Sequence, residues 1–342
     1  MENMNDIPAS QPSHKEPLPN TGIAIAGDEA IVYPSKPELE ESKSKINVWL
    51  RSLSSLALYF VIGYFFFNRD WMLVLVLTGV VVFHELGHFM AMKLYNYTDL
   101  GIFFIPLLGA YASGTKREIS QTQSAIIILA GPVPGIIIGV GLYFLALQQQ
   151  NMFLGQTAGI LVFLNLLNLI PIYPLDGGQL LNRLFLDDSA IIGKVFVVIS
   201  SLVLAWIFIK LGSHNSVLYG LLLFPVMMIS RLFTDIKHER IITEIEKEGV
   251  DLNTAYEDIT SEQYWKIRHA LIKHHPDLSG VKQAPPYEYS DNEEKVVTTM
   301  QGLLQRIIIL DLSLAAKLII IFIWLGCFGV LFLVDTPLSR FY

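Results

Sequence analysis

The sequence has little cysteine and little charge. It contains one cysteine, Cys327, which excludes an internal disulfide framework and a cysteine-based zinc site. Charged residues make up only 16% of the chain, whereas hydrophobic residues make up 52%. A composition this apolar is typical of a multi-span membrane protein and not of a soluble enzyme.

The chain also lacks a basic excess and an N-terminal signal sequence. Its formal net charge of -7 argues against nucleic-acid binding, which needs a basic face. Residues 1–20 contain no apolar h-region, so we expect no cleaved signal peptide. The first apolar run should then act as the insertion signal.

Seven apolar runs follow a polar N-terminal stretch. Residues 1–45 carry scattered prolines among Ser, Glu and Lys and predict a flexible tail, because this composition cannot bury enough apolar surface to fold. The sequence then predicts an all-α polytopic membrane protein with about seven transmembrane helices. The runs cover residues 46–67, 71–92, 124–147, 155–173, 190–211, 217–230 and 312–334.

Positive charges near the ends of these runs are distributed asymmetrically. If the N-terminus is cytosolic, the outer connections hold only Arg69, Lys210 and Arg340 close to a span, and the inner connections hold far more Lys and Arg. The positive-inside rule therefore predicts a cytosolic N-terminus.

Residues 234–306 predict a small helical segment on the cytosolic side. Residues 235–248 place isoleucines on roughly one face, Thr260 and Gln263 form a capping box that opens a second helix, and residues 290–293 offer a third start. We expect the segment to cover the membrane core, with contact to a partner as the alternative.

The second apolar run contains the sequence His84-Glu85-Leu86-Gly87-His88. On a helix the two histidines lie one turn apart on the same face, so both imidazoles can bind one metal ion. This is the H-E-x-x-H pattern of zinc hydrolases, in which the Glu is the general base. Ionisable groups at bilayer depth are costly and usually functional, which favours a metal site over a structural cluster.

Asp176 is the candidate for the third ligand that catalytic zinc sites usually have. It lies in the stretch N-L-I-P-I-Y-P-L-D-G-G that begins at Asn168 and ends the fourth run. The second and fourth runs cross the membrane in the same direction, so Asp176 and His84 should lie at similar depth, in the cytosolic third. An Asp-Gly turn at a helix end is the alternative. The prolines and glycines break the helix and predict that water reaches the site from the cytosol.

Two pairs of residues near these motifs are further candidates. Asn165 and Asn168 face similar directions on a helix, so one of them could bind a substrate carbonyl or oxyanion, and Asn165 could equally be a polar contact between spans. Gly131 and Gly135 form a G-x-x-x-G pattern, whose commonest meaning is close helix packing.

Residues 100–112 are apolar but too short to span a bilayer. Gly101, Pro106 and Gly109 interrupt them, which predicts a hairpin that dips into the membrane edge. Such a hairpin could pair with an unwound substrate segment, or it could be an interfacial loop without that role.

Taken together, these motifs make the sequence resemble the site-2 protease family of intramembrane zinc metalloproteases. The resemblance covers residues 71–185 and rests on the H-E-x-x-H motif, on the G-x-x-x-G at 131–135 and on N-x-x-P-x-x-x-x-D-G at 168–177. It implies one Zn²⁺ per chain, bound by His84, His88 and Asp176, with Glu85 as catalytic base and Asn168 as a substrate-positioning or oxyanion-binding residue.

The resemblance implies an endopeptidase that cuts transmembrane segments of other proteins within the lipid bilayer. We expect a bacterial cytoplasmic membrane, and four parts: the tail 1–45, a membrane core 46–233 with its catalytic part at 71–185, the segment 234–306, and a final transmembrane helix in 307–342. A membrane transporter or metal-handling protein that uses the same His, Glu and Asp residues is one alternative. An inactive helix-binding relative is another, although the intact Glu85 speaks against it.

Overall fold

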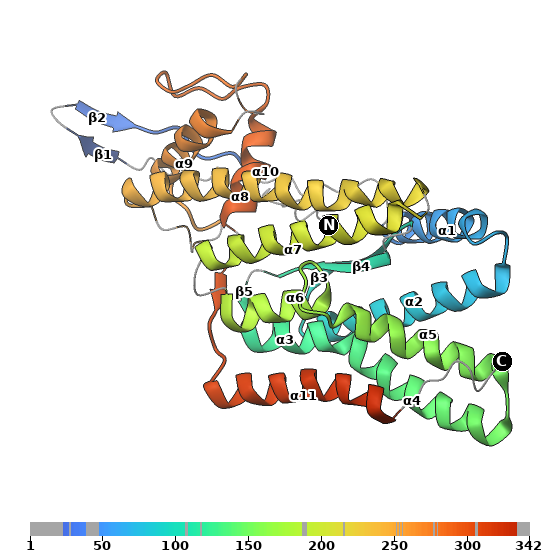
Figure 1. Cartoon of the computed structure of the whole chain (residues 1–342). Coiled ribbons are helices and arrows are strands. Elements are labelled where there is room, and N and C mark those ends of the chain that lie inside the picture. Colours follow the sequence, from blue (N-terminus) through green and yellow to red (C-terminus); the bar gives the residue numbers. More distant parts are fainter. Residues whose placement is uncertain are drawn as a thin grey trace, which may run out of the picture. The chain divides into compact units, whose positions relative to one another are not determined.

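Helices make up most of the described part of the chain in the computed structural model (Figure 1). The chain divides into a first unit, Met1–Glu40 with Ile241–Leu304, and a second unit, Glu41–Arg240 with Gln305–Tyr342. The structure describes residues 23–26, 29–38, 48–106, 109–116, 118–186, 190–214, 216–250, 252, 254, 256–275, 278, 280–304 and 307–333.

The second unit contains the helices of membrane-spanning length, of which α8 continues past the unit's boundary at Arg240. Six spans are found among the described residues by length and composition, and a shorter apolar helix, α5, joins them. The helices are α1 (Val48–Phe66), α2 (Trp71–Leu94), α3 (Gln121–Ala130) continued by α4 (Pro132–Gln149), α5 (Met152–Asn168), α7 (Ala190–Gly212), α8 (Leu223–Lys247) and α11 (Leu314–Leu333). The predicted polytopic helical membrane fold is therefore confirmed.

Helix α5 ends earlier than the fourth apolar run suggests. The apolar run predicts a span over residues 155–173, but the helix stops at Asn168, ahead of Pro171. Proline lacks an N–H and its ring restricts the residue before it, so the backbone leaves the helix at this point. The freed segment continues to a short helix, α6 (Asp176–Leu181), which a π-helical turn (Asn182–Leu186) extends.

Helix α8 joins two elements that the sequence analysis kept separate. A 3₁₀ turn (Ser216–Leu222) precedes it, and one continuous helix then replaces the short run 217–230 and the separate helix 235–248. Pro225 lies in its first turn, where the missing N–H leaves no hydrogen bond unmade. No Gly or Pro follows before Gly249, so nothing in the sequence stops the helix.

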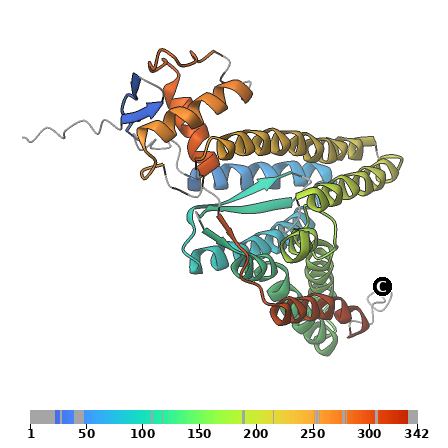
Figure 2. The same cartoon turned by 90° about the vertical axis from the view of Figure 1, so that its left-hand side faces the viewer.

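The predicted hairpin is present next to the membrane helices. Strands β3 (Thr98–Ile105) and β4 (Gly109–Thr115) pair antiparallel, with Ile102 opposite Ala112. The backbone N–H of Phe104 donates to Ser55 Oγ of α1 over 3.1 Å, which holds the hairpin alongside that helix (Figures 1 and 2).

A second pair of strands ties the C-terminal part to the start of α3. Strand β5 (Glu118–Ser120) pairs in parallel with β6 (Ile307–Ile309). The carboxylate of Asp311 accepts hydrogen bonds from Ser120 Oγ, at 2.5 Å, and from the backbone N–H of Thr122, at 3.0 Å. These contacts hold the segment just before α11 against the start of α3.

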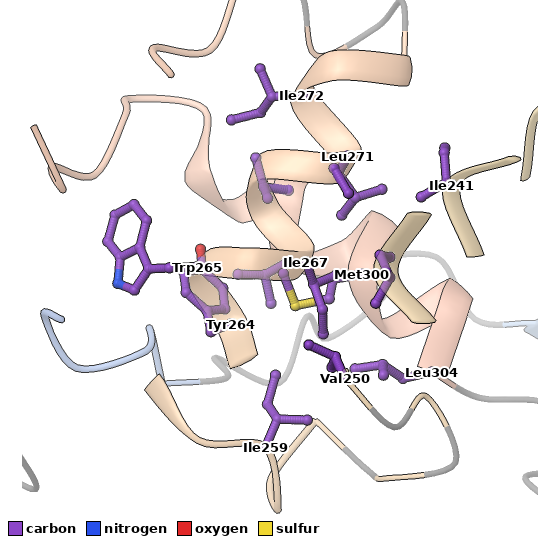
Figure 3. Packing of buried hydrophobic residues seen from close by; sticks show 14 of the residues in the cluster. Ile241, Val250, Ile259, Tyr264, Trp265, Ile267, Leu271, Ile272, Met300 and Leu304 are labelled. Atoms are coloured by element: carbon purple, nitrogen blue, oxygen red, sulfur yellow. The ribbon is translucent and has the colours of Figure 1, made fainter. Parts of the chain in front are cut away.

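The first unit has its own hydrophobic core. Helix α9 (Ser261–His274) begins with the predicted capping box of Thr260 and Gln263, and α10 (Glu293–Leu304) packs against it. Figure 3 shows Ile267 of α9 beside Met300 of α10, and Leu304 of α10 beside Val250.

A buried ion pair lies in this core. The guanidinium of Arg268, which is 1% exposed, donates to both carboxylate oxygens of Glu293 over 2.6 and 2.9 Å, and the Tyr264 hydroxyl also donates to Glu293. Burial alone would raise the pKa of Glu293, but the hydrogen bonds from Arg268 and Tyr264 hold the pKa below its usual value.

Residues 33–38 pack onto the first unit, although the sequence analysis assigned them to a flexible tail. The Lys36 ammonium donates to the carbonyl oxygens of Tyr256, Glu257 and Ile259 over 2.7, 2.5 and 2.8 Å. The indole N–H of Trp265 donates to the carbonyl of Pro34 over 3.0 Å. Strands β1 (Ile23–Ala26) and β2 (Glu29–Val32) form a hairpin just before them. Of the predicted tail, residues 1–22, 27–28 and 39–45 lie outside the described residues, and the four-part division of the chain stays a prediction.

We expect Glu293→Gln to destabilise the first unit by roughly 3 kcal/mol, because it leaves the Arg268 charge buried without its carboxylate. The measurement is thermal unfolding of the whole protein in detergent. A separate limited proteolysis of the folded protein measures how readily residues 241–304 are cut. Glu262→Gln is the control, because Glu262 forms a partly exposed pair with Lys266 and should cost under about 1 kcal/mol. Equal losses in the two variants would contradict the prediction.

Candidate metal centre

Helix α2 places two histidines one turn apart in the interior of the second unit. His84 and His88 are both buried, and their Nε2 atoms lie 3.1 Å apart. The four-residue spacing of the motif on a regular helix accounts for this approach. Gly87 allows α2 to lie close to the next helix, because a Cβ at this position would lie 2.0 Å from the carbonyl oxygen of Ala130.

The broken backbone after α5 brings Asp176 to the histidines. The backbone N–H of Tyr173 donates to Ser200 Oγ of α7 over 3.1 Å and anchors this segment. Asp176 is then the first residue of α6, and its Oδ2 lies 3.0 Å from His84 Nε2 and 3.4 Å from His88 Nε2. The three residues that the sequence predicts as ligands therefore meet at one point, where they could hold a metal ion.

The other nitrogen of each imidazole faces a hydrogen-bond acceptor. His88 Nδ1 lies 2.8 Å from the backbone oxygen of Ile127, and His84 Nδ1 lies 2.8 Å from Asn165 Oδ1. Both oxygens can only accept, so each neutral ring carries its hydrogen on Nδ1. Both Nε2 lone pairs therefore face Asp176.

This arrangement fits a small divalent cation. Two imidazole lone pairs and a carboxylate oxygen are three acceptors, and Asp176 Oδ2 has no hydrogen-bond donor among the described residues. Buried acceptors that face one another are costly unless a cation joins them. In a tetrahedral zinc site with bonds of about 2.0–2.1 Å, ligand atoms lie about 3.3 Å apart. The observed separations of 3.0, 3.1 and 3.4 Å match this value.

The glycines of the G-x-x-x-G motif make room for the side chains of the site. A Cβ at Gly131 would lie 2.3 Å from His88 Nε2, and a Cβ at Gly135 would lie 2.3 Å from Asn165 Nδ2. Any larger residue would displace these polar groups. The two glycines thus let the helix backbone lie close to the side chains of His88 and Asn165.

Glu85 lies beside this cluster and is buried as well. The backbone of Ala112 lies near its carboxylate, which brings strand β4 to the site. Its Oε2 has no hydrogen-bond partner among the described residues. One oxygen of the predicted general base is therefore free to take a proton.

Asn168 and Asn165 have different surroundings. Asn168 is the last residue of α5 and half-buried, and the described contacts do not join it to the histidines or to Asp176. Asn165 is buried and contacts His84 directly. The predicted role of Asn168 in substrate binding stays a prediction.

Helix α11 supports the segment that carries Asp176, a contact that the sequence analysis did not identify. The indole N–H of Trp324 donates to the carbonyl of Leu169 over 2.9 Å. A Cβ at Gly177 would lie 2.0 Å from that same oxygen. The available signal was Trp324 itself, because an indole N–H in an apolar membrane-spanning helix needs an acceptor.

We expect Gly131→Ala to weaken zinc binding by at least about tenfold, because the added methyl group displaces His88 Nε2. Zinc content after dialysis against a graded chelator measures the effect. Gly141→Ala is the matched control, since a Cβ at this position of α4 meets nothing within 4 Å. If both variants retain zinc like the wild type, the described position of His88 is wrong.

Comparisons with known proteins agree with this site. Residues 72–158, which contain the H-E-x-x-H motif and both glycines, match the model of Peptidase family M50. Stage IV sporulation protein FB of Bacillus subtilis is 30% identical over 110 residues, which cover 31% of this chain and 38% of that protein. A zinc metalloprotease of Methanocaldococcus jannaschii is 29% identical over 213 residues, which cover 60% of each chain.

The chain thus spans less than two thirds of the length of these curated relatives. The solved structure of the site-2 protease from Methanocaldococcus jannaschii is 26% identical, covers 51% of this chain and 84% of its own, and has a TM-score of 0.40. On the family match over residues 72–158 and the curated relatives, this multi-pass membrane protein is homologous to the zinc metalloproteases of the M50, or site-2 protease, family.

Proposed function

We propose that this protein is an intramembrane zinc endopeptidase that hydrolyses peptide bonds within or near transmembrane segments of other membrane proteins. One observation carries the proposal: two imidazole lone pairs and a carboxylate oxygen converge within apolar helices, beside a carboxylate with a free oxygen. The H-E-x-x-H motif of metalloproteases uses the same groups, with the histidines as zinc ligands and the glutamate as general base.

His84, His88 and Asp176 would hold the zinc ion and leave a fourth position open. When bound, zinc lowers the pKa of a coordinated water molecule and polarises a carbonyl group. The Nδ1 hydrogen bonds of both histidines keep the rings in the orientation that ligation needs.

Glu85 acts as the general base in this proposal. Its unpartnered Oε2 accepts a proton from the attacking water and then delivers that proton to the nitrogen of the leaving amine. General acid–base catalysis of this kind contributes about 10²–10⁴-fold to a rate.

Strand β4 is the element best placed to receive substrate. It contacts Glu85 through Ala112, and a strand can accept an extended peptide by main-chain hydrogen bonds. A transmembrane helix must unwind before its peptide bonds can react, so an edge strand at the base supports this chemistry. Asn168, at the end of α5, is the candidate for binding the oxyanion.

The asymmetric positive charges support a cytosolic N-terminus, with the site in the cytosolic part of a bacterial cytoplasmic membrane. A transporter would place the same residues along a substrate path at a repeat interface. The free oxygen of Glu85 favours hydrolysis over transport and over an inactive relative.

We expect Glu85→Gln to lower cleavage by about 10²–10⁴-fold while zinc stays bound, because Gln cannot take a proton from water. The measurement is mass spectrometry of terminal peptides from membranes that contain either form. New chain ends within transmembrane segments should appear with the wild type and with Glu262→Gln, a surface control. Identical chain ends for wild type and Glu85→Gln would refute the proposed catalysis.

A further inference from the structure

We propose that Asn165 is a positioning residue that fixes the hydrogen and the ring orientation of His84, and that Gly135 is glycine because the Asn165 amide occupies its side-chain space. This inference rests on the proposed metal site. It assigns to Asn165 a role toward the protein's own ligand and not toward substrate.

The orientation of the Asn165 amide follows from its surroundings in α5. The side chain is 1% exposed, so solvent does not compete for its hydrogen bonds. Nδ2 lies 2.7 Å from the backbone oxygen of Leu161, one turn earlier in the helix. A carbonyl oxygen can only accept, so the NH₂ group must face Leu161 and Oδ1 must face His84.

This orientation fixes the tautomer of His84. Asn165 Oδ1 can only accept, and it lies 2.8 Å from His84 Nδ1, so that nitrogen must carry the hydrogen. A neutral imidazole has one N–H, and Nε2 is therefore left with a lone pair 3.0 Å from Asp176 Oδ2. In the opposite tautomer two lone pairs would face each other across the Asn165 contact, and Nε2 could not bind a metal.

Both histidines carry their hydrogen on Nδ1, but they donate it to different kinds of acceptor. His88 donates to the main-chain oxygen of Ile127, which no substitution of a side chain removes directly. His84 depends on a side chain, that of Asn165. Substitution of Asn165 therefore removes the hydrogen-bond partner of His84 and leaves the partner of His88, the Ile127 oxygen, in place.

Gly135 of α4 provides the space for this contact. A Cβ at this position would lie 2.3 Å from Asn165 Nδ2 and 2.8 Å from Oδ1, distances that would force the amide to move. Helices α4 and α5 lie side by side (Figure 1), and Asn165 is buried. Gly139, one turn later in α4, would instead meet Val162 Cγ2 at 2.7 Å.

The test uses the full-length protein in detergent and measures zinc affinity by chelator competition and the visible absorption spectrum of the Co²⁺ form. Asn165→Leu, similar in size but without hydrogen bonds, should bind zinc about 10–100-fold more weakly and shift the Co²⁺ spectrum. Asn165→Asp keeps an acceptor for His84 Nδ1 and should restore most of the affinity. Asn151→Ala removes the N-cap of α5 and should leave the zinc affinity unchanged.

The glycine pair provides a second, independent test. Gly135→Ala should weaken zinc binding at least about tenfold, whereas Gly139→Ala, which crowds the same helix pair, should not. In an Asn165→Ala background the effect of Gly135→Ala should disappear, because the methyl group no longer meets an amide. This pair decides the question if Asn165→Leu does not fold.

The outcomes separate this inference from the proposed function. If wild type binds zinc and Asn165→Leu binds it equally well with the same Co²⁺ spectrum, Asn165 does not position His84 and the inference is wrong. Equal zinc affinities for Gly135→Ala and Gly139→Ala would overturn it as well. If the wild type itself binds no zinc, the proposed function fails first.

Discussion

The mutual approach of three buried acceptors is the interaction on which the rest of the membrane unit depends. His84 Nε2, His88 Nε2 and Asp176 Oδ2 lie within 3.4 Å of one another. Burying each of them without a donor costs on the order of a few kcal/mol. A divalent cation held between them would turn this repulsion into attraction, so its binding would contribute to the stability of the fold.

The surrounding helices keep the three groups at this distance. Gly131 and Gly135 remove side chains where His88 and Asn165 need space, and the helix break after Asn168 turns Asp176 inward. Helix α11 then holds that break through Trp324, and strand β4 brings the backbone of Ala112 near Glu85. Elements far apart in the sequence thus converge on a small set of polar groups, which is expected where polar groups must be satisfied without water.

The sequence predicts that His84, His88 and Asp176 meet because its signals are local. A four-residue spacing on a helix brings His84 and His88 together, and the direction of two spans brings Asp176 to their level. It does not show that Asn165, rather than Asn168 three residues later, contacts His84, because this depends on how α5 packs against Gly135. The contacts of Lys36 with residues 256–259, and of Trp324 with Leu169, join distant parts of the chain and leave no local pattern. The end of α5 and the length of α8 could be read from Pro171 and from the lack of a breaker after Pro225.

X-ray absorption at the zinc edge of the purified protein tests the central claim most directly. The account predicts one zinc per chain with two imidazole nitrogens and oxygen ligands at about 2.0–2.1 Å. It also predicts that Asp176→Ala removes a first-shell oxygen or the metal, while both imidazoles keep their signature in any zinc that remains. A first shell with sulfur, or one with fewer than two imidazoles, would contradict the assignment of His84, His88 and Asp176 as the metal ligands.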